Sequence, residues 1–313
     1  MSKLPISLII DDGCVINTFF YHDLAIRHEH LIQPAMAMLF GKVCEKYGVR
    51  GKFSVVPVPC CLGRLDEPDK INQVPAENVR AFVEYTKKYI APRFSITPEL
   101  LTHFLAWNNE RRKGLHYCED TFIARCTADE IADYLSLGLQ ILDNIGLTPS
   151  GVSSPWSTGI DNEENYSRGV GMAFKRTFNA ERTFYRLHSC EPGFTKPREM
   201  CNSAETGRVI NVPNNTTDAF WGSQNPAGFD TAVANVRNGI DRLLSSDGKS
   251  GRLRELYEAG EPLVMLTHWQ SLYSDGRLIG LDGLEELLQR IQRIFGSNVE
   301  WMDFDEISRH YCP

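Results

Sequence analysis

The stretch that most constrains the fold is ISLIIDDG at residues 6–13, where an apolar run meets two acids and a glycine. A short apolar run bounded by a turn signal is typical of a buried strand. Because glycine permits a sharp turn, we expect Asp11 and Asp12 at the carboxyl end of this strand, where parallel α/β folds place their chemistry. Adjacent acids repel each other, so a metal, an arginine or a histidine is expected nearby. The alternative is a plain Asp-Gly turn after a strand.

Predicted strands and helices alternate along the rest of the chain. Further strands are expected at 52–56, 150–156, 183–187, 208–212, 263–267 and 299–302. Helices are expected at 31–47, 76–90, 127–145, 163–174, 231–244, 252–259, 281–295 and from 303 onward. Capping boxes mark two helix starts, Thr127–Glu130 and Asp303–Glu306, and Gly48 closes the first helix. The segment 94–105 is predicted as a strand or a short turn, and 107–124 as a loop.

Strand–helix–strand alternation predicts a parallel sheet. We expect one α/β domain over residues 1–313, folded as a (β/α) barrel with an irregular insertion near 60–75. A doubly wound open sheet is the second architecture that the pattern allows.

Composition narrows the function classes. Hydrophobic residues make up 42% and charged residues 23%, as in an ordinary soluble globular protein. A net charge of −7 without any basic run argues against a nucleic-acid partner. The start MSKLPISLII indicates neither a signal peptide nor a membrane span. Nine scattered cysteines without a CxxC pair indicate reduced thiols, so we expect a cytoplasmic protein. The sequence leaves open whether it is a homo-oligomer.

Chemistry-bearing side chains follow three predicted strands. Asp11 and Asp12 end the first, His103 ends the segment near 101, and His268 ends the strand at 263–267. In a parallel barrel these ends share one mouth. An Asp with two or three His suits Zn²⁺ or another divalent transition metal. A water in an open coordination position would become a nucleophile, with the second carboxylate as general base and a further His as general acid.

Five stretches resemble, in order, the motifs of the polysaccharide deacetylase (chitooligosaccharide deacetylase-like) family. ISLIIDDG resembles its first motif, usually TFDDG, and KYGVRGKFSVVP resembles its second strand. GLQILDNIGLTPSGVSSPWSTG resembles its helix and RxPxG motif. PLVMLTHWQ resembles its LxH motif and VEWMDFDEI its final strand and helix. The resemblance implies a distorted (β/α)7 barrel and a metal-dependent hydrolase that removes an acyl group from a carbohydrate or small amide.

The resemblance also implies roles for individual residues. Asp11 would be the base that activates water, and Asp12 a metal ligand. His103 would be the first ligand of the family's HxxxH pair, and His268 the acid that protonates the leaving group. Asp218, in TTDAFW, is a candidate match to the fourth motif.

Two departures from the family pattern stand out. The second histidine of HxxxH is replaced by Trp107, and the arginine that usually steadies the base falls at Ser153. We therefore expect a third metal ligand from elsewhere, with His22 preferred, and that the cation beside Asp11 is missing. His116 and the Asn108 carbonyl are the other candidate ligands.

The expected substrate is a small molecule or an oligosaccharide. Pro155 belongs to the motif region, and Trp107, Trp156 and Trp269 adjoin motif residues, so these four are candidate substrate contacts. Two other functions fit the same barrel. One is a metal-independent glycosidase-like enzyme that pairs Asp11 with another acid, for which the candidates are Glu99, Asp161 and Asp218. The other is an inactive sugar-binding barrel.

Overall fold

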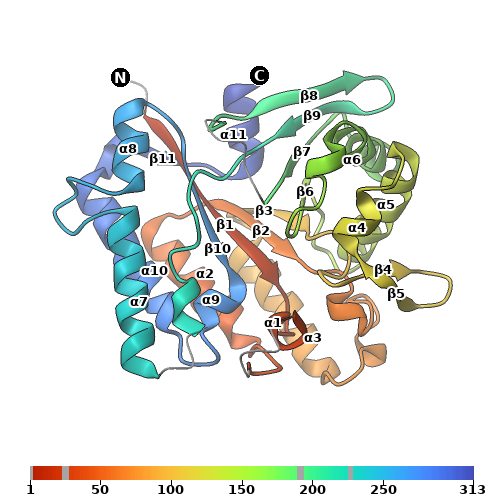
Figure 1. Ribbon diagram of the computed structural model, residues 1–313, viewed down its shortest axis with the longest axis horizontal. Helices are drawn as coiled ribbons and strands as arrows, with labels where there is room; N and C mark the ends of the chain where they lie inside the picture. The colour runs from red at the N-terminus through yellow and green to blue at the C-terminus, as the bar shows by residue number, and fades with distance from the viewer. Residues whose placement is uncertain (1–2, 23–27, 189–193, 225–227) are drawn as a thin grey trace.

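The computed structural model describes residues 3–22, 28–188, 194–224 and 228–313, and its centre is a row of parallel strands (Figure 1). In spatial order these are β10 (Leu263–His268), β1 (Leu4–Gly13), β2 (Gly51–Val55), β3 (Phe94–Pro98), β6 (Gly151–Ser153), β7 (Arg182–Arg186) and β9 (Gly207–Asn211). A parallel bridge between Glu99 and Ser153 joins β3 to β6. Strand β11 (Val299–Trp301) pairs with the start of β1. The predicted α/β fold of mainly parallel strands is confirmed.

The row consists of two sheets joined by the bridge between Glu99 and Ser153, and in the described residues isolated hydrogen bonds, without a strand ladder, link the chain beyond β9 to β10. The outer edge of β9 is taken by the antiparallel strand β8 (Arg198–Ser203), which the sequence did not indicate. Beyond β9 the chain turns toward β10, where Asn215 N donates to Val264 O at 2.8 Å. Leu266 N donates to Thr216 Oγ1 at 3.1 Å.

Helices surround the strands (Figure 1), and the longer ones lie at or close to the predicted places. The longer ones are α2 (Ala35–Tyr47), α3 (Ala76–Tyr85), α5 (Ala128–Asn144), α6 (Glu163–Phe178), α7 (Phe229–Leu243), α8 (Arg252–Ala259) and α10 (Ile279–Ile294). The shorter ones are α1 (Phe19–His22), α4 (Glu119–Ile123), α9 (Trp269–Tyr273) and α11 (Phe304–Tyr311), of which α1, α4 and α9 were not predicted. Single helical turns occupy Pro59–Cys61, Pro68–Lys70, Thr86–Ile90, Ile160–Asn162, Trp221–Gln224 and Gly296–Asn298. Both predicted capping boxes form, and Gly48 ends α2 with a φ of 68°.

Successive side chains of β1 point to opposite faces of the sheet, and this alternation decides which of the two acids faces the interior. Ile6, Leu8 and Ile10 pack in the large core beneath the helices, whereas Ile9 packs in the smaller core inside the barrel. That inner core also holds strand residues Phe184, Ile210, Val212, Val264 and Leu266, with Phe304 and Ile307 of α11. Since alternate residues of a strand share a face, Asp11 points inward, two positions after Ile9.

The carboxyl end of β1 differs from the predicted Asp-Gly turn. The strand continues through Gly13, and its register with β2 shifts between Ile10 and Gly13. The left-handed residue in this irregularity is Asp12, with a φ of 64°. A Cβ on Gly13 would lie 2.4 Å from Ser54 O, so the glycine is needed for close approach to β2.

The prediction of a loop at 107–124 is wrong. This segment contains an antiparallel hairpin, β4 (Leu105–Asn108) and β5 (Lys113–Cys118), and then α4. The hairpin projects from the body of the protein beside α4 and α5 (Figure 1). Its strands are short and β5 is largely exposed, so no apolar alternation reveals them in the sequence.

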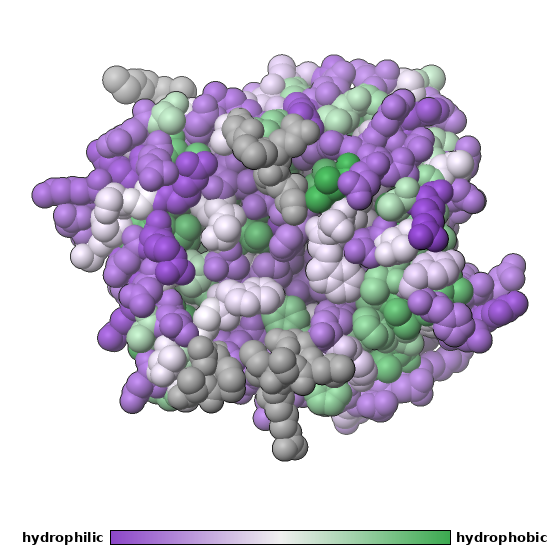
Figure 2. Space-filling view, in the orientation of Figure 1, coloured by the Kyte–Doolittle hydropathy of each residue, from purple (hydrophilic) through white to green (hydrophobic). Residues whose placement is uncertain are grey.

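The surface seen in Figure 2 is mostly hydrophilic, with apolar side chains in small separate patches where it is not covered by grey atoms. None of the described helices has the length and apolar character that a membrane crossing requires. Eight cysteines lie in the described ranges, all as free thiols, and Cys190 lies outside them.

Candidate active site

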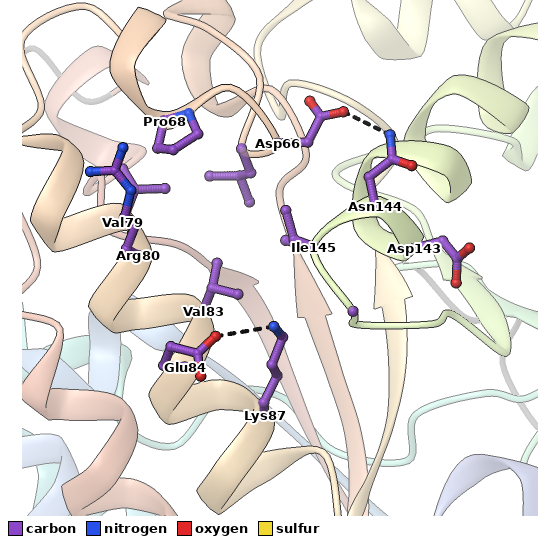
Figure 3. A pocket seen from close by; sticks show the side chains of 12 residues that line it. Asp66, Pro68, Val79, Arg80, Val83, Glu84, Lys87, Asp143, Asn144 and Ile145 are labelled. Atoms are coloured by element: carbon purple, nitrogen blue, oxygen red, sulfur yellow. Dashed lines mark hydrogen bonds and ion pairs between the residues drawn. The ribbon is translucent and has the colours of Figure 1, made fainter.

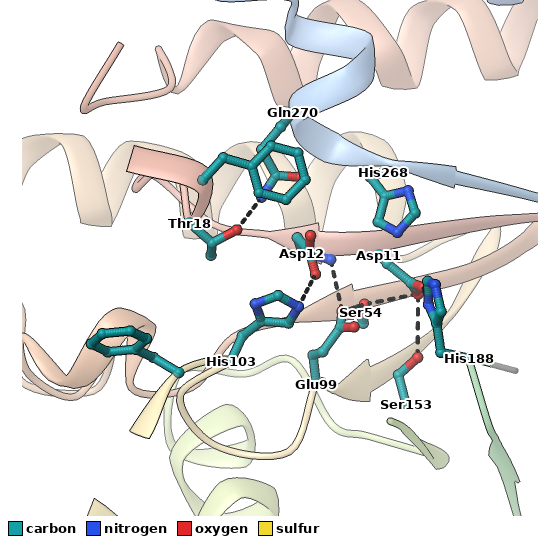
Figure 4. Close-up of polar contacts among 12 residues, drawn as sticks. Asp11, Asp12, Thr18, Ser54, Glu99, His103, Ser153, His188, His268 and Gln270 are labelled. Carbon is teal, nitrogen blue, oxygen red and sulfur yellow. Dashed lines mark hydrogen bonds and ion pairs between the residues drawn. The ribbon is translucent and has the colours of Figure 1, made fainter. Parts of the chain in front are cut away.

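The predicted site residues meet at the carboxyl ends of the strands. Asp11 lies directly opposite His268 in the parallel pairing of β1 with β10. Asp12 faces His103, which lies in the loop after β3 (Figure 4). Two groups of possible ligand atoms result, each with all atoms within 4.8 Å of one another. One group is Asp11, His188 and His268, and the other is Asp12, Glu99 and His103.

Asp11 lies between two buried cations, which corrects the prediction that its cation is missing. Lys52 Nζ lies 2.5 Å from Asp11 Oδ1, and Arg186 Nη1 contacts Asp11 Oδ2. All three side chains are fully buried. Burial alone would raise the pKa of Asp11, but Arg186 and then Lys52 hold it well below its usual range. Ser153, at the family's arginine position, accepts a hydrogen bond from Lys52 and lies 3.3 Å from Asp11.

A second carboxylate, Asp218, orients His268. His268 Nδ1 lies 2.8 Å from Asp218 Oδ2, which also accepts the His268 backbone N–H at 3.1 Å and the Ser271 hydroxyl at 2.7 Å. Burial would lower the pKa of His268, but Asp218, followed by Asp12 and Asp11, raises it to about 9. His268 is therefore an imidazolium near neutral pH, with its Nδ1 hydrogen bond fixed.

Asp12, Glu99 and His103 form a buried group with a different charge balance. His103 Nε2 lies 3.1 Å from Asp12 Oδ1, and the Asp12 backbone N–H donates to Glu99 Oε2 at 2.7 Å. Burial, and next the charge of Glu99, raise the pKa of Asp12 well above its usual range. Burial lowers the pKa of His103 to about 4, which leaves it as the neutral imidazole that metals bind.

The structure brings Glu99, four residues before His103, into one group with His103 and Asp12. Trp107, at the position expected for the second histidine of the motif, is buried in the core. The signal was in the sequence, since Glu99 directly follows the strand that precedes His103. It is missed when only histidines are considered as partners.

His22, the preferred third ligand, lies outside both groups. Its ring stacks on the ring of His103 with centroids 4.9 Å apart and also contacts Trp156 at 5.2 Å. Burial and the neighbouring His103 lower the pKa of His22 to about 3. The other two candidates lie on the hairpin, where His116 is exposed and Asn108 Oδ1 accepts the Arg111 N–H.

A buried carboxylate, Glu119 at the start of α4, holds the loop that carries Glu99 and His103. It accepts the backbone N–H groups of Leu101, Thr102 and His103 at 3.0, 2.9 and 2.8 Å. The Tyr134 hydroxyl donates to it at 2.7 Å. The loop needs such an anchor because Leu100 and His103 adopt left-handed φ values of 44° and 49°.

The donor set of the second group fits a divalent metal. Asp12 Oδ2 and His103 Nδ1 are buried and make no hydrogen bond within the described ranges, and Asp12 Oδ1 lies 3.1 Å from His103 Nε2. Buried polar atoms are normally paired, so such a cluster indicates a partner that the polypeptide itself does not provide. Carboxylate oxygens and a neutral imidazole are ordinary metal ligands.

Of the predicted aromatic contacts, one lies at the site. The Trp156 ring is 4.7 Å from that of His103, and Pro155, beside it in sequence, is buried. Trp269 is wholly buried against Phe53, and Trp107 is 5% exposed in the core, so neither offers a free ring face. A further tryptophan, Trp221, was missed.

Trp221 lies beside His268, whereas Trp156 lies beside His103. It is 51% exposed, with its ring 5.1 Å from that of His268. The only sequence signal is its position three residues after Asp218.

A separate hollow of about 550 Å³ lies outside this site (Figure 3). It is formed by the insertion near residue 65, one face of α3 and the end of α5. Its charged side chains are paired, Lys87 with Glu84 and Asp66 with Asn144 and Arg64. It contains none of the predicted site residues.

Comparison with known proteins supports the fold. No family model and no curated protein matches the sequence. A solved "putative polysaccharide deacetylase" from Mycobacterium smegmatis is similar with a TM-score of 0.56 and 12% identity, over 99% of this chain and 90% of that one. An allantoinase has a TM-score of 0.49 and 13% identity over 98% and 89% of the two chains. A pseudoenzyme from Bacillus anthracis has a TM-score of 0.44 and 10% identity, over 98% of this chain and 70% of that one. The chain thus has the polysaccharide deacetylase fold, as its ordered motifs predict.

Proposed function

We propose that this protein is a metal-dependent hydrolase that removes an acyl group from an amide or ester of a carbohydrate or other small molecule. The observation that carries the proposal is the β1–β10 register, which places the ionised Asp11 directly opposite the protonated His268. The neighbouring residue, Asp12, belongs to the metal-ligand group with Glu99 and His103. The deacetylase fold supports this reading by analogy, since one fold serves many functions.

The proposed mechanism divides the residues into two sets. Asp12, Glu99 and His103 would hold the metal, which when bound supplies a Lewis acid for water and the acyl carbonyl. Asp11 accepts the proton of the attacking water, and Lys52 and Arg186 keep it ionised for this purpose. Because the same cations make Asp11 a weak base, it passes the proton on readily. His268 donates a proton to the departing amine or alcohol, while Asp218 holds its ring in place.

Two aromatic side chains favour a ring-shaped substrate. Trp221 flanks the site beside His268, and Trp156 flanks it beside His103. An aromatic face suits the apolar face of a sugar ring. The alternative glycosidase reading has weaker support, because Asp218 is engaged with His268 and Asp161 is exposed.

The test is acyl release by the purified protein with and without metal. N-acetylglucosamine oligomers and O-acetylated sugars would be incubated with chelator-treated protein and with protein resupplied with Mn²⁺ or Zn²⁺. We expect acetate release only with metal, and none from the Asp11→Asn and His268→Gln variants. Full activity on glycosides in chelator would instead establish the glycosidase. Sugar binding without turnover under any metal condition would establish the inactive barrel.

A further inference from the structure

The metal-ligand group has an unusual balance of donors for a site in a transition-metal hydrolase. Two of its three protein ligands are carboxylates, Asp12 and Glu99, and one is an imidazole, His103. Imidazole suits Zn²⁺, Cu²⁺ and Ni²⁺, whereas carboxylate oxygens suit Mg²⁺, Ca²⁺ and Mn²⁺. A glutamate at position 99 therefore changes which metal the site prefers.

Glu99 is held in a fixed orientation as a ligand would be. Its Oε2 accepts hydrogen bonds from the Asp12 backbone N–H and from the Ser54 hydroxyl. One of its carboxylate oxygens lies within 4.8 Å of the ligand atoms of Asp12 and His103. The side chain is 1% exposed, so its position depends on the protein and not on solvent. Hydrogen bonds to ligand atoms orient metal ligands in this way.

The charges of the group also favour a divalent cation. Asp12 and Glu99 are both buried, and neither is joined to a lysine or arginine by an ion pair in the ranges that the structure describes. Asp11, one residue away, has two such cations. Two buried carboxylates together match the charge of one divalent cation.

We propose that the site is built for an oxygen-preferring divalent cation, with Mn²⁺ the best match because it also accepts one imidazole, and that Glu99 sets this preference. The inference rests on the proposed function only in assuming that the group binds a metal.

The test measures metal affinity without substrate. Metal-free, full-length protein would be titrated with Mn²⁺ and followed by the electron paramagnetic resonance signal of the free ion. Zn²⁺ affinity would be measured by competition with a chromophoric chelator. The variants are Glu99→His, Glu99→Gln and the control His22→Gln, whose ring lies against His103 but outside the group.

In Glu99→His we expect the ratio of the Mn²⁺ to the Zn²⁺ dissociation constant to rise at least tenfold. In Glu99→Gln both metals should bind at least tenfold more weakly, a range typical for disturbed metal sites. His22→Gln should weaken binding of either metal less than Glu99→Gln does, because His22 packs on His103 but offers no ligand atom to the group.

An unchanged ratio in Glu99→His, or a loss in His22→Gln as large as in Glu99→Gln, would overturn the inference. Glu99→Gln keeps the shape of the side chain, so it tests whether Glu99 is a ligand even if Glu99→His fails to fold, and unchanged affinity for both metals in this variant would also overturn the inference. Metal binding that depends on Glu99 in a protein that hydrolyses no acyl substrate would remove the proposed function and leave this inference intact. Metal-dependent acyl hydrolysis in which Glu99→His leaves the ratio of the Mn²⁺ to the Zn²⁺ dissociation constant unchanged would support the proposed function and overturn this inference.

Discussion

Asp11 and Asp12 are neighbours in sequence and both are buried, yet their surroundings are opposite. Asp11 faces the barrel interior with Lys52 and Arg186 bound to its two oxygens, and its pKa is well below the usual range. Asp12, turned by its left-handed φ, faces Glu99 and His103, and its pKa is well above that range. One half of the site thus carries its own counter-charge, and the other would be completed by the cation proposed above. The same residue type serves two purposes because a single irregularity in β1 directs the two side chains to different neighbours.

The largest expected effect is a loss of kcat, and it distinguishes the residues that transfer protons from those proposed to bind the metal. His268→Gln should lower kcat by roughly 10²–10⁴-fold, the usual contribution of a general acid. Its metal dissociation constant should stay unchanged, because His268 is outside the Asp12 group. Asp12→Asn should show the converse, a lost metal affinity. Steady-state kinetics and metal titration on both variants make the comparison, which fails if His268→Gln loses the metal as Asp12→Asn does.

The next effect concerns stability of the metal-free protein. Asp11→Asn leaves Lys52 and Arg186 as buried cations without their carboxylate, so we expect the free energy of unfolding to fall by about 3–5 kcal/mol. Asp12→Asn replaces a buried carboxyl that has no lysine or arginine ion pair among the described residues, so the free energy of unfolding should be unchanged or higher. Urea denaturation of both variants in chelator measures the difference. Equal destabilisation by the two substitutions would contradict the contrast drawn between the two acids.

A smaller effect is expected where the protein holds the metal half in shape. Glu119→Gln weakens three backbone hydrogen bonds to the ligand loop, which should lower the free energy of unfolding by about 0.5–1.5 kcal/mol per bond. Metal affinity should fall roughly 10–100-fold, as for other groups that orient ligands. Tyr134→Phe, which removes one bond to the same carboxylate, is the matched milder variant. A Glu119→Gln protein with lowered stability but unchanged metal affinity would show that this residue supports only the fold.

The smallest effect is a shift in the pH profile. His268 must be protonated to act as an acid, so activity should fall as pH rises through about 9. Asp218→Asn removes the main charge that raises the pKa of His268, and the alkaline limb should move down by about one unit or more, which is worth about 1.4 kcal/mol per unit. The acid limb should stay in place, since Asp218 does not contact Asp11. An alkaline limb still at 9 in Asp218→Asn would mean that another group controls it.

Much of this site could be predicted from strand ends. The apolar runs before Asp11 and His268 are clear in the sequence, and parallel pairing brings their ends together. The helices were predictable because their apolar spacing and caps are local. What a single strand cannot reveal is which side chain lies across from it. Lys52 and Arg186 come from two other strands, so the counter-charge of Asp11 could not be deduced from the motif position at Ser153.

Other misses have local causes. Asp12 adopts a left-handed φ beside a glycine that does not, so the residue pattern pointed to the wrong position for the turn. Trp107 and Trp269 adjoin motif residues in sequence, but strand and helix geometry directs both into the core. A lysine inside the apolar strand GKFSV was the one hint that this strand faces a polar interior.

The position of β1 has a consequence for how the chain is made. This first strand lies between β2 and β10, and its opening residues pair with β11, so its neighbours are spread over nearly the whole chain. During synthesis, residues 4–13 leave the ribosome long before 263–301 exist to cover them. An apolar strand with an unpaired edge is prone to aggregate while it waits. Until the last sixth of the chain is made, β1 can pair only with β2, so a partial sheet of β1, β2 and β3 is the arrangement that can shield it.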